Sequence, residues 1–242
     1  FAPVLATDGS AVMVGEYRAL TANGGYNNKT SLTYTDKRND NNERLNEKEF
    51  RGHVDASGRF NLDETWRWGF GLSRATDDTY LGRYGLTDAD VLTTSLFVGG
   101  FRGRQYMAAS AHTFQGLNVD DNPGTTPVVA PLFDYVVTLQ PERLPGRLYF
   151  DASAVSLYRR EGFDSRRISA GGTWRLPYAA PAGDLYTMTA GLGLDLYSVN
   201  GFFETGGRGT ASSTSSLQAR LRPTMSLDWR FPFVRHERSV RQ

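Results

Sequence analysis

LQARLRPTMSLDWRF, residues 217–231, alternates between apolar and polar side chains along its whole length. Its odd positions are apolar or proline, as at Leu217 and Leu221, and its even positions are polar, as at Arg220 and Arg222. Because successive side chains of a strand point to opposite faces, a strand formed by this stretch would have one apolar face and one polar, largely charged face. Strands of soluble proteins usually span about five or six residues, whereas membrane strands need about 9–11. This stretch therefore predicts a membrane strand.

The composition excludes several classes of protein. The 242 residues suffice for one large domain or two small ones, and the net charge of +1 does not favour a nucleic-acid partner. The absence of cysteine excludes disulfides and thiolate metal sites. No stretch approaches the roughly 20 apolar residues of a membrane helix, although the mean hydropathy of −0.44 alone would suit a soluble protein. The first ten residues lack the basic and apolar regions of a signal peptide.

The same period of two recurs along most of the chain, and no convincing helical stripe is found. About eleven strands are predicted, many of them ten or more residues long. They cover residues 11–20, 26–35, 50–57, 60–73, 91–101, 104–114, 132–140, 147–159, 168–176, 185–197 and 215–231.

The predicted connections alternate between short and long. The short ones are 21–25, Ser57–Gly58, Gly103, 141–146 and 178–183, and the long ones are 36–46, 74–90, 115–131 and 199–214, with an intermediate one at 160–166. Outer-membrane barrels have short periplasmic turns at one end and long extracellular loops at the other. The fold class predicted is an all-β, antiparallel up-and-down transmembrane β-barrel in the bacterial outer membrane. A soluble β-sandwich is the alternative, and it would bury the apolar face of residues 217–231 against a second sheet.

The loop polarity also predicts an incomplete barrel. Strands 11–20 and 215–231 would both run toward the periplasm, which places residues 1–10 outside and makes the strand count odd. Complete bacterial barrels have an even number of strands. Residues 1–242 are therefore expected to be a partial barrel domain, about eleven strands of a larger barrel that lacks strands at both ends.

Short motifs follow one another along most of the chain in a fixed order. They are Gly15–Arg18, Phe50–His53, Trp66–Phe70, Thr76–Tyr84, Phe114–Leu117, the proline-rich 123–131, Ser156–Gly162 and Leu227–Phe233. As an ordered series they resemble the LptD family of lipopolysaccharide-assembly outer-membrane proteins, also called OstA, with Thr76 where the family has serine.

This resemblance implies a non-enzymatic part in lipopolysaccharide export, with no cofactor. Family members hold a plug lipoprotein (LptE-like) inside the barrel and receive lipopolysaccharide from a periplasmic bridge protein through a jelly-roll domain. The glycolipid then leaves laterally, between the first and last strands, into the outer-membrane lipid. No segment of this chain is left for the jelly-roll, and the cysteines that many members carry are missing.

Two groups of residues are candidates for contact with lipopolysaccharide or the plug lipoprotein. The predicted outer loop 74–90 contains Asp77, Asp78, Tyr80, Arg83 and Tyr84, and its spaced aromatic residues predict that it folds back onto the barrel or onto the partner. The second group is Arg220 and Arg222, whose predicted lumen position could guide phosphate-bearing sugars. Other charged residues also occupy positions that the alternation places on the lumen face: Arg51, Asp55, Asp63, Arg67, Asp228 and Arg230.

Other functions have weaker support. His53, His112 and His236 are too scattered to predict a catalytic or metal site. A porin-like or other outer-membrane transporter would need a constricting inward loop or a plug domain. An outer-membrane hydrolase would need a serine or aspartate close to a histidine at the outer rim. The role of Pro223, whose residue type is normally excluded from central strands, is left open between a bulge, a kink and a local opening.

Overall fold

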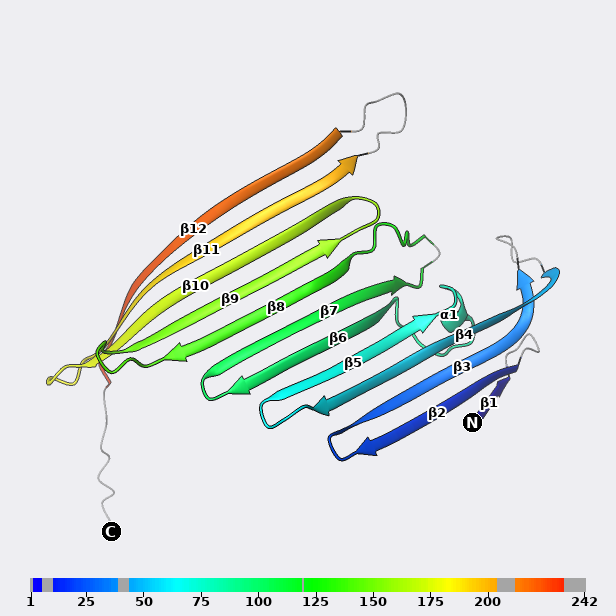
Figure 1. Ribbon diagram of the computed structural model, residues 1–242, viewed down its shortest axis with the longest axis horizontal. Helices are drawn as coiled ribbons and strands as arrows, with labels where there is room; N and C mark the ends of the chain where they lie inside the picture. The colour runs from blue at the N-terminus through cyan, green and yellow to red at the C-terminus, as the bar shows by residue number, and fades with distance from the viewer. Residues whose placement is uncertain (1, 6–10, 39–43, 119, 204–211, 233–242) are drawn as a thin grey trace, which may run out of the picture.

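A computed structural model describes residues 2–5, 11–38, 44–118, 120–203 and 212–232 (Figure 1). These residues form one antiparallel sheet in which every strand pairs with its neighbours in the chain, so the topology is an up-and-down meander. The strands are β1 (Ala2–Leu5), β2 (Ala11–Thr21), β3 (Gly24–Arg38), β4 (Arg44–Asn61), β5 (Trp66–Ala75), β6 (Val91–Arg102), β7 (Gln105–Gly116), β8 (Val128–Leu139), β9 (Arg147–Tyr158), β10 (Phe163–Ala179), β11 (Leu185–Phe203) and β12 (Ser212–Arg230); the short helix α1 is Tyr80–Arg83.

The eleven predicted strands correspond to β2–β12, and β1 is an additional one. Residues Ala2–Leu5 pair with β2 from Val14 to Ala11, within a segment that had been assigned to the extracellular side. The argument from an odd strand count is therefore wrong, because the described sheet has 12 strands. The sheet is nevertheless open, since β1 and β12 are its two edges and do not pair with each other.

The predicted turn at Ser57–Gly58 is also wrong. Strand β4 continues to Asn61, and the chain reverses at 62–65, where the Asp63 carboxylate accepts hydrogen bonds from the backbone of Thr65 and Trp66. Asp63 therefore belongs to a turn and not to the lumen wall. A Cβ at Gly58 would come within 2.7 Å of the Phe70 ring, so this glycine allows close packing rather than a turn.

Two predicted long connections are partly strand. Strand β3 extends to Arg38 and β4 begins at Arg44, while β11 extends to Phe203 and β12 begins at Ser212. The other two predicted long connections keep most of their length as loops, 76–90 and 117–127, at the same end of the sheet. Short turns join the strands at the opposite end, for example between β2 and β3 and between β6 and β7.

Cross-strand register assigns the side chains to two faces, because residues directly opposite each other lie on the same side of a sheet. Opposite residues on one face include Tyr186 and Trp229, Met188 and Leu227, and Leu194 and Leu221. This face is apolar and uncovered: Leu217, Leu221, Met225, Leu227, Trp229, Met188 and Leu192 are all exposed, Met225 by 84%. Along it, β9, β11 and β12 carry no charged side chain in the described residues, and β10 carries Asp164 and Arg166 near one end.

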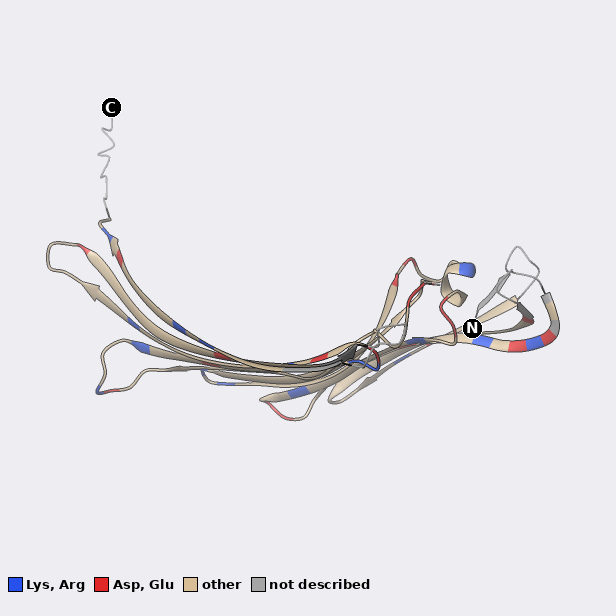
Figure 2. Ribbon diagram, turned by 90° about the horizontal axis from the view of Figure 1, so that it is seen from above, with Lys and Arg blue, Asp and Glu red and all other residues tan. Residues whose placement is uncertain are grey.

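Figure 2 shows that the sheet is curved and that α1 lies on its concave side. Helix α1 contacts the face that carries Ser31 and Arg51, so the polar face is concave and the apolar face is convex. In the described part of the chain no second layer covers the convex face. The soluble sandwich is thereby excluded, and the sheet is part of an incomplete transmembrane β-barrel. None of the helices in the described residues is long and apolar enough to span a membrane.

Pro223 lies on β12, opposite Leu192, and the pairing of β11 with β12 continues through it without a register shift. A bulge in this pair is therefore not the reason for the proline. Strand β12 is an edge of the described sheet, and proline is tolerated on edge strands because one side of the strand has no ladder partner there.

Neighbouring residues on opposite faces of β12 test the assignment of the two faces. We predict that Met225→Arg lowers the free energy of unfolding in lipid vesicles by about 2–4 kcal/mol, because it places a charge in hydrocarbon. The matched variant Thr224→Arg places the same side chain on the concave face and should change that free energy by less than about 0.5 kcal/mol. Equal effects of the two variants would contradict the assignment.

Candidate functional site

Connection 76–90 folds back onto the concave face, as its spaced aromatic residues predicted. Tyr80, Leu81 and Tyr84 are buried and form a cluster with Val12 of β2 and Leu92 of β6. This is an inward-folded loop at the long-loop end of the sheet, and α1 is its centre (Figure 1).

The local strand geometry makes room for this loop. Pairing between β5 and β6 ends at Gly71 and Ser95. Closer to the long-loop end, the Thr94 hydroxyl accepts a hydrogen bond from the N–H of Ser73 and donates one to its C=O. The Gln115 side-chain amide likewise accepts from the N–H of Ala75 and donates to its C=O. Polar side chains thus replace the missing ladder bonds where β5 leaves the sheet and leads into the loop.

An ion pair holds the start of the loop. Arg51 donates to both carboxylate oxygens of Asp77, with Nε 2.8 Å from Oδ2, and also donates to Thr79 Oγ1 at 2.8 Å. Thr76 adds two bonds to Gly52, one through its N–H and one through its hydroxyl. We call Arg51, Asp77, Thr76 and Thr79 the loop latch.

Beneath the helix, a short hydrogen-bonded chain joins Tyr80 to the wall. The Tyr80 hydroxyl lies 2.7 Å from Ser31 Oγ, which in turn lies 2.7 Å from His53 Nδ1. This places a serine beside a histidine at the long-loop end, as the hydrolase alternative requires. Ser31 is fully buried under Tyr80, so its hydroxyl is closed to a substrate while the loop is docked.

Two ionisable groups of the loop, Asp77 and Tyr80, have pKa values shifted in opposite directions. Burial alone would raise the pKa of the Asp77 carboxyl, but hydrogen bonds from Arg51, Thr76 and Thr79 outweigh it and lower that pKa below 3.8. Burial raises the pKa of the Tyr80 hydroxyl above 10.0. At neutral pH the latch therefore contains a carboxylate and the cluster contains a neutral phenol.

The structure separates the five candidate residues of this loop. Asp77, Tyr80 and Tyr84 pack against the wall, and the Tyr84 hydroxyl is buried with no hydrogen-bond partner among the described residues. The Arg83 guanidinium lies 5.8 Å from the Tyr84 ring centroid. Asp78 and Asp77 both line a cavity of about 720 Å³ at the rim, together with Arg74, Arg159 and Arg160.

The second candidate group, Arg220 and Arg222, lies on the concave face as predicted. Arg222 Nε is 2.8 Å from Asp195 Oδ2, and Arg167 is 3.0 Å from Asp195 Oδ1. Ser169 donates to the same carboxylate at 2.6 Å, and Arg220 is directly opposite Asp195 in the register. Asp195 is 2% exposed, whereas Arg167 is 44% and Arg222 50% exposed. One buried carboxylate thus orients two partly exposed guanidinium groups.

Asp195, Arg167 and Ser169 were missed by sequence reasoning. Their parity places them on the concave face, but three strands had to be aligned in register before they could be seen to meet. The Arg222 guanidinium crosses over Gly193 on its way to Asp195, since a Cβ at Gly193 would be in van der Waals contact with it at 3.4 Å.

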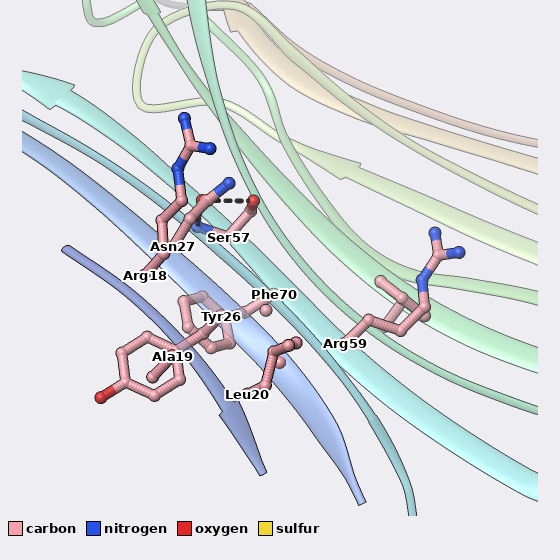
Figure 3. A pocket seen from close by; sticks show the side chains of 11 residues that line it. Arg18, Ala19, Leu20, Tyr26, Asn27, Ser57, Arg59 and Phe70 are labelled. Atoms are coloured by element: carbon pink, nitrogen blue, oxygen red, sulfur yellow. Dashed lines mark hydrogen bonds between the residues drawn. The ribbon is translucent and has the colours of Figure 1, made fainter. Parts of the chain in front are cut away.

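A groove of about 800 Å³ crosses the concave face near the short turns. Figure 3 shows Arg18 and Arg59 at this groove, with the hydrogen bond between Ser57 and Asn27 that ties β4 to β3. Leu20, which also lines it, is 93% exposed. In the described residues no group of three metal-ligating side chains is found, and His236 lies outside those residues.

An open antiparallel wall with an apolar convex face and a polar concave face defines a transmembrane β-barrel protein. Residues 49–242 match the model of the family LptD, described as LPS transport system D. The match covers well over half of the chain, and the chain belongs to this family. The family consists of outer-membrane transport and assembly proteins for lipopolysaccharide. A comparison with curated proteins gives no match.

Two tyrosines of the cluster should respond differently to loss of the hydroxyl. Tyr80→Phe removes the bond to Ser31 and should destabilise loop docking by about 1 kcal/mol. Tyr84→Phe removes a buried hydroxyl that has no partner in the described residues and should be neutral or stabilising. Amide hydrogen exchange in residues 79–86 measures both, and equal acceleration in the two variants would contradict this difference.

The lowered pKa of Asp77 gives loop docking a pH dependence. A carboxyl whose folded pKa is depressed stabilises the docked state above its ordinary pKa, and this contribution is lost as the pH falls through the lowered value. We expect the protection factors of the amides in residues 76–86, which correct for the intrinsic pH dependence of exchange, to fall below pH 3.8 in the parent protein. In Asp77→Asn, exchange should already be faster at pH 7 and should change less on acidification. An unchanged acid response in Asp77→Asn would show that other groups control docking.

Proposed function

We propose that the protein is the barrel component of a translocon that delivers lipopolysaccharide and inserts it into the outer leaflet of the outer membrane. The observation that carries this proposal is the LptD family match, which spans strands that form a membrane-type wall. The uncovered apolar convex face provides the contact with membrane lipid, and the polar concave face provides a hydrated inner surface.

The concave face is proposed to meet both the cargo and a plug lipoprotein (LptE-like). Arg167 and Arg222 use one side of each guanidinium for Asp195, which leaves further N–H donors for an anion. Arg220, opposite Asp195, adds a third cation. Guanidinium groups suit phosphate because their donors match its oxygens in pairs. Phosphate-bearing sugars of lipopolysaccharide would be guided by these three arginines.

Delivery from the periplasmic bridge protein is proposed to use a jelly-roll domain, which the described strands do not form, because all of them belong to one meander. Lateral release would occur where an edge of the barrel wall opens. The proposal requires no enzymatic step, no cofactor and no nucleic acid.

A porin-like transporter is the second candidate, and one observation favours it. The loop 76–90 folds inward, as a constricting loop would. The family match supports lipopolysaccharide transport instead, since the matched residues 49–242 include this loop.

Depletion of the protein in its own bacterium tests the two candidates. We expect newly made lipopolysaccharide to fall at the cell surface and to accumulate before the outer membrane, as measured by pulse labelling and surface-accessible modification. A protein carrying Arg220→Glu and Arg222→Glu should restore delivery less well than one carrying Gln218→Glu, which adds one negative charge on the same face. Normal surface lipopolysaccharide with reduced uptake of small solutes would contradict the proposal and favour the porin.

A further inference from the structure

Two arginines face each other at the short-turn end of the wall. Arg147 of β9 is directly opposite Arg175 of β10, so both side chains lie on the same face, and both are exposed. Parity places them on the concave face with Arg167 and Ser169. Like charges directly opposite each other destabilise a sheet, so the pair calls for a compensating anion.

No carboxylate compensates this pair in the described residues. Neither guanidinium takes part in the ion pairs that join Arg18 to Glu16, Arg51 to Asp77 and Glu49, and Arg167 and Arg222 to Asp195. Asp151, on the same face of β9, has its carboxylate beside Gly171, where a Cβ would lie 2.7 Å from Oδ1. The two positive charges therefore remain available to an external anion.

The surrounding structure holds the pair in place. The Trp174 indole donates to Pro145 O at 2.8 Å, which fixes turn 140–146 against β10. At Gly146 φ is +95°, and a Cβ there would come within 2.4 Å of the Arg175 carbonyl oxygen. The Arg175 guanidinium lies 5.8 Å from the Tyr149 ring centroid. These contacts fix the backbone that carries both arginines, and the contact with Tyr149 limits the positions of the Arg175 side chain.

Acidic residues dominate two long connections, at the end of the sheet opposite to Arg147 and Arg175. The long connections 76–90 and 117–127 contain Asp77, Asp78, Asp88, Asp90, Asp120 and Asp121 against the single base Arg83, and Figure 2 shows acidic segments beside α1. The short turns carry both signs, with Arg104 and Arg143 against Asp63, Glu64, Glu142 and Asp184, and Arg104 bonds to Gln140 at 3.0 Å, which ties two turns together. An anion is therefore disfavoured at the acidic long connections, and at the short-turn end Arg147 and Arg175 themselves attract it.

We propose that Arg147 and Arg175, here called the rim arginine pair, form a binding site for a phosphate group of an anionic glycolipid at the periplasmic entrance of the barrel. A phosphate monoester carries about −1.5 to −2 charges at pH 7 and has three acceptor oxygens, so one group satisfies two guanidiniums. A single carboxylate of an acidic protein segment carries only one negative charge and would leave a net positive charge on the pair. The periplasmic placement rests on the proposed function, which assigns the short turns to that side.

Binding of lipopolysaccharide to the purified protein in detergent micelles tests the site. The double variant Arg147→Gln and Arg175→Gln should bind phosphorylated lipopolysaccharide at least about tenfold more weakly than the parent, because charge-assisted bonds are lost. Arg147→Lys with Arg175→Lys keeps the charge without the planar fork and should lose less. The control Arg166→Gln, on the convex face of β10, should bind like the parent.

Three further measurements identify the ligand and exclude a purely structural role. Dephosphorylated lipopolysaccharide should bind the parent and the double glutamine variant equally. The thermal unfolding midpoint of the double variant should stay the same or rise, since a repulsive pair is removed. An unchanged affinity for phosphorylated lipopolysaccharide, a lower unfolding midpoint, or a loss confined to an acidic peptide would each overturn the proposal. Inorganic phosphate that binds as tightly as the glycolipid would overturn the assignment to a lipid.

The binding test of the rim arginine pair and the depletion test of the proposed function can fail independently of each other. If depletion of the protein blocks lipopolysaccharide delivery while the rim variants bind normally, only the rim site is wrong. If depletion leaves delivery intact, the translocon proposal fails whatever the rim arginine pair binds.

Discussion

The pairing of backbone polar groups at bilayer depth is the constraint on which the rest of this structure depends. Hydrocarbon offers no hydrogen-bond partners, so each strand must find them in its neighbours, and the meander gives each of β3–β11 a neighbour on both sides. Once pairing and register are set, the period of two decides which side chains meet lipid and which meet water. Where the β5–β6 ladder stops, the side chains of Thr94 and Gln115 complete the bonds of β5. These side chains allow β5 to leave the sheet and begin the docked loop without unpaired backbone.

The concave face uses charge in three different ways. Asp77 and Arg51 satisfy each other and fix a loop, whereas Asp195 orients two arginines that stay partly exposed. Arg147 and Arg175 have no carboxylate partner in the described residues and repel each other. The first arrangement is structural, the second holds donors ready for a ligand, and the third is the least stable until an anion binds. These three arrangements fit a wall that holds its own loop at one end and accepts anionic cargo at the other.

Much of the architecture could be predicted because the period-two signal is strong over long strands such as residues 217–231. Local sequence signals for turns were less reliable. Ser57 and Gly58 have the composition of a turn, but a glycine is needed at position 58 because aromatic rings of β4 and β5 pack against it. Strand β1 was missed because four residues are too few to show a period. The docking of Tyr80 and Tyr84 could be inferred from their spacing, since free loops rarely need spaced aromatics. The clusters at Asp195 and at the rim arginine pair could not, because they depend on which residues of separate strands stand opposite each other.

Accessibility along β12 tests the central claim most directly. Spin labels placed one at a time from position 217 to position 229, in the protein in lipid bilayers, report collisions with dissolved oxygen and with a water-soluble nickel complex. The account predicts strict alternation: odd positions such as 221 and 225 collide with oxygen, and even positions such as 218 and 222 collide with nickel. Uniform accessibility, or alternation in the opposite phase, would show that the convex face does not meet lipid and would contradict the membrane wall on which every other conclusion rests.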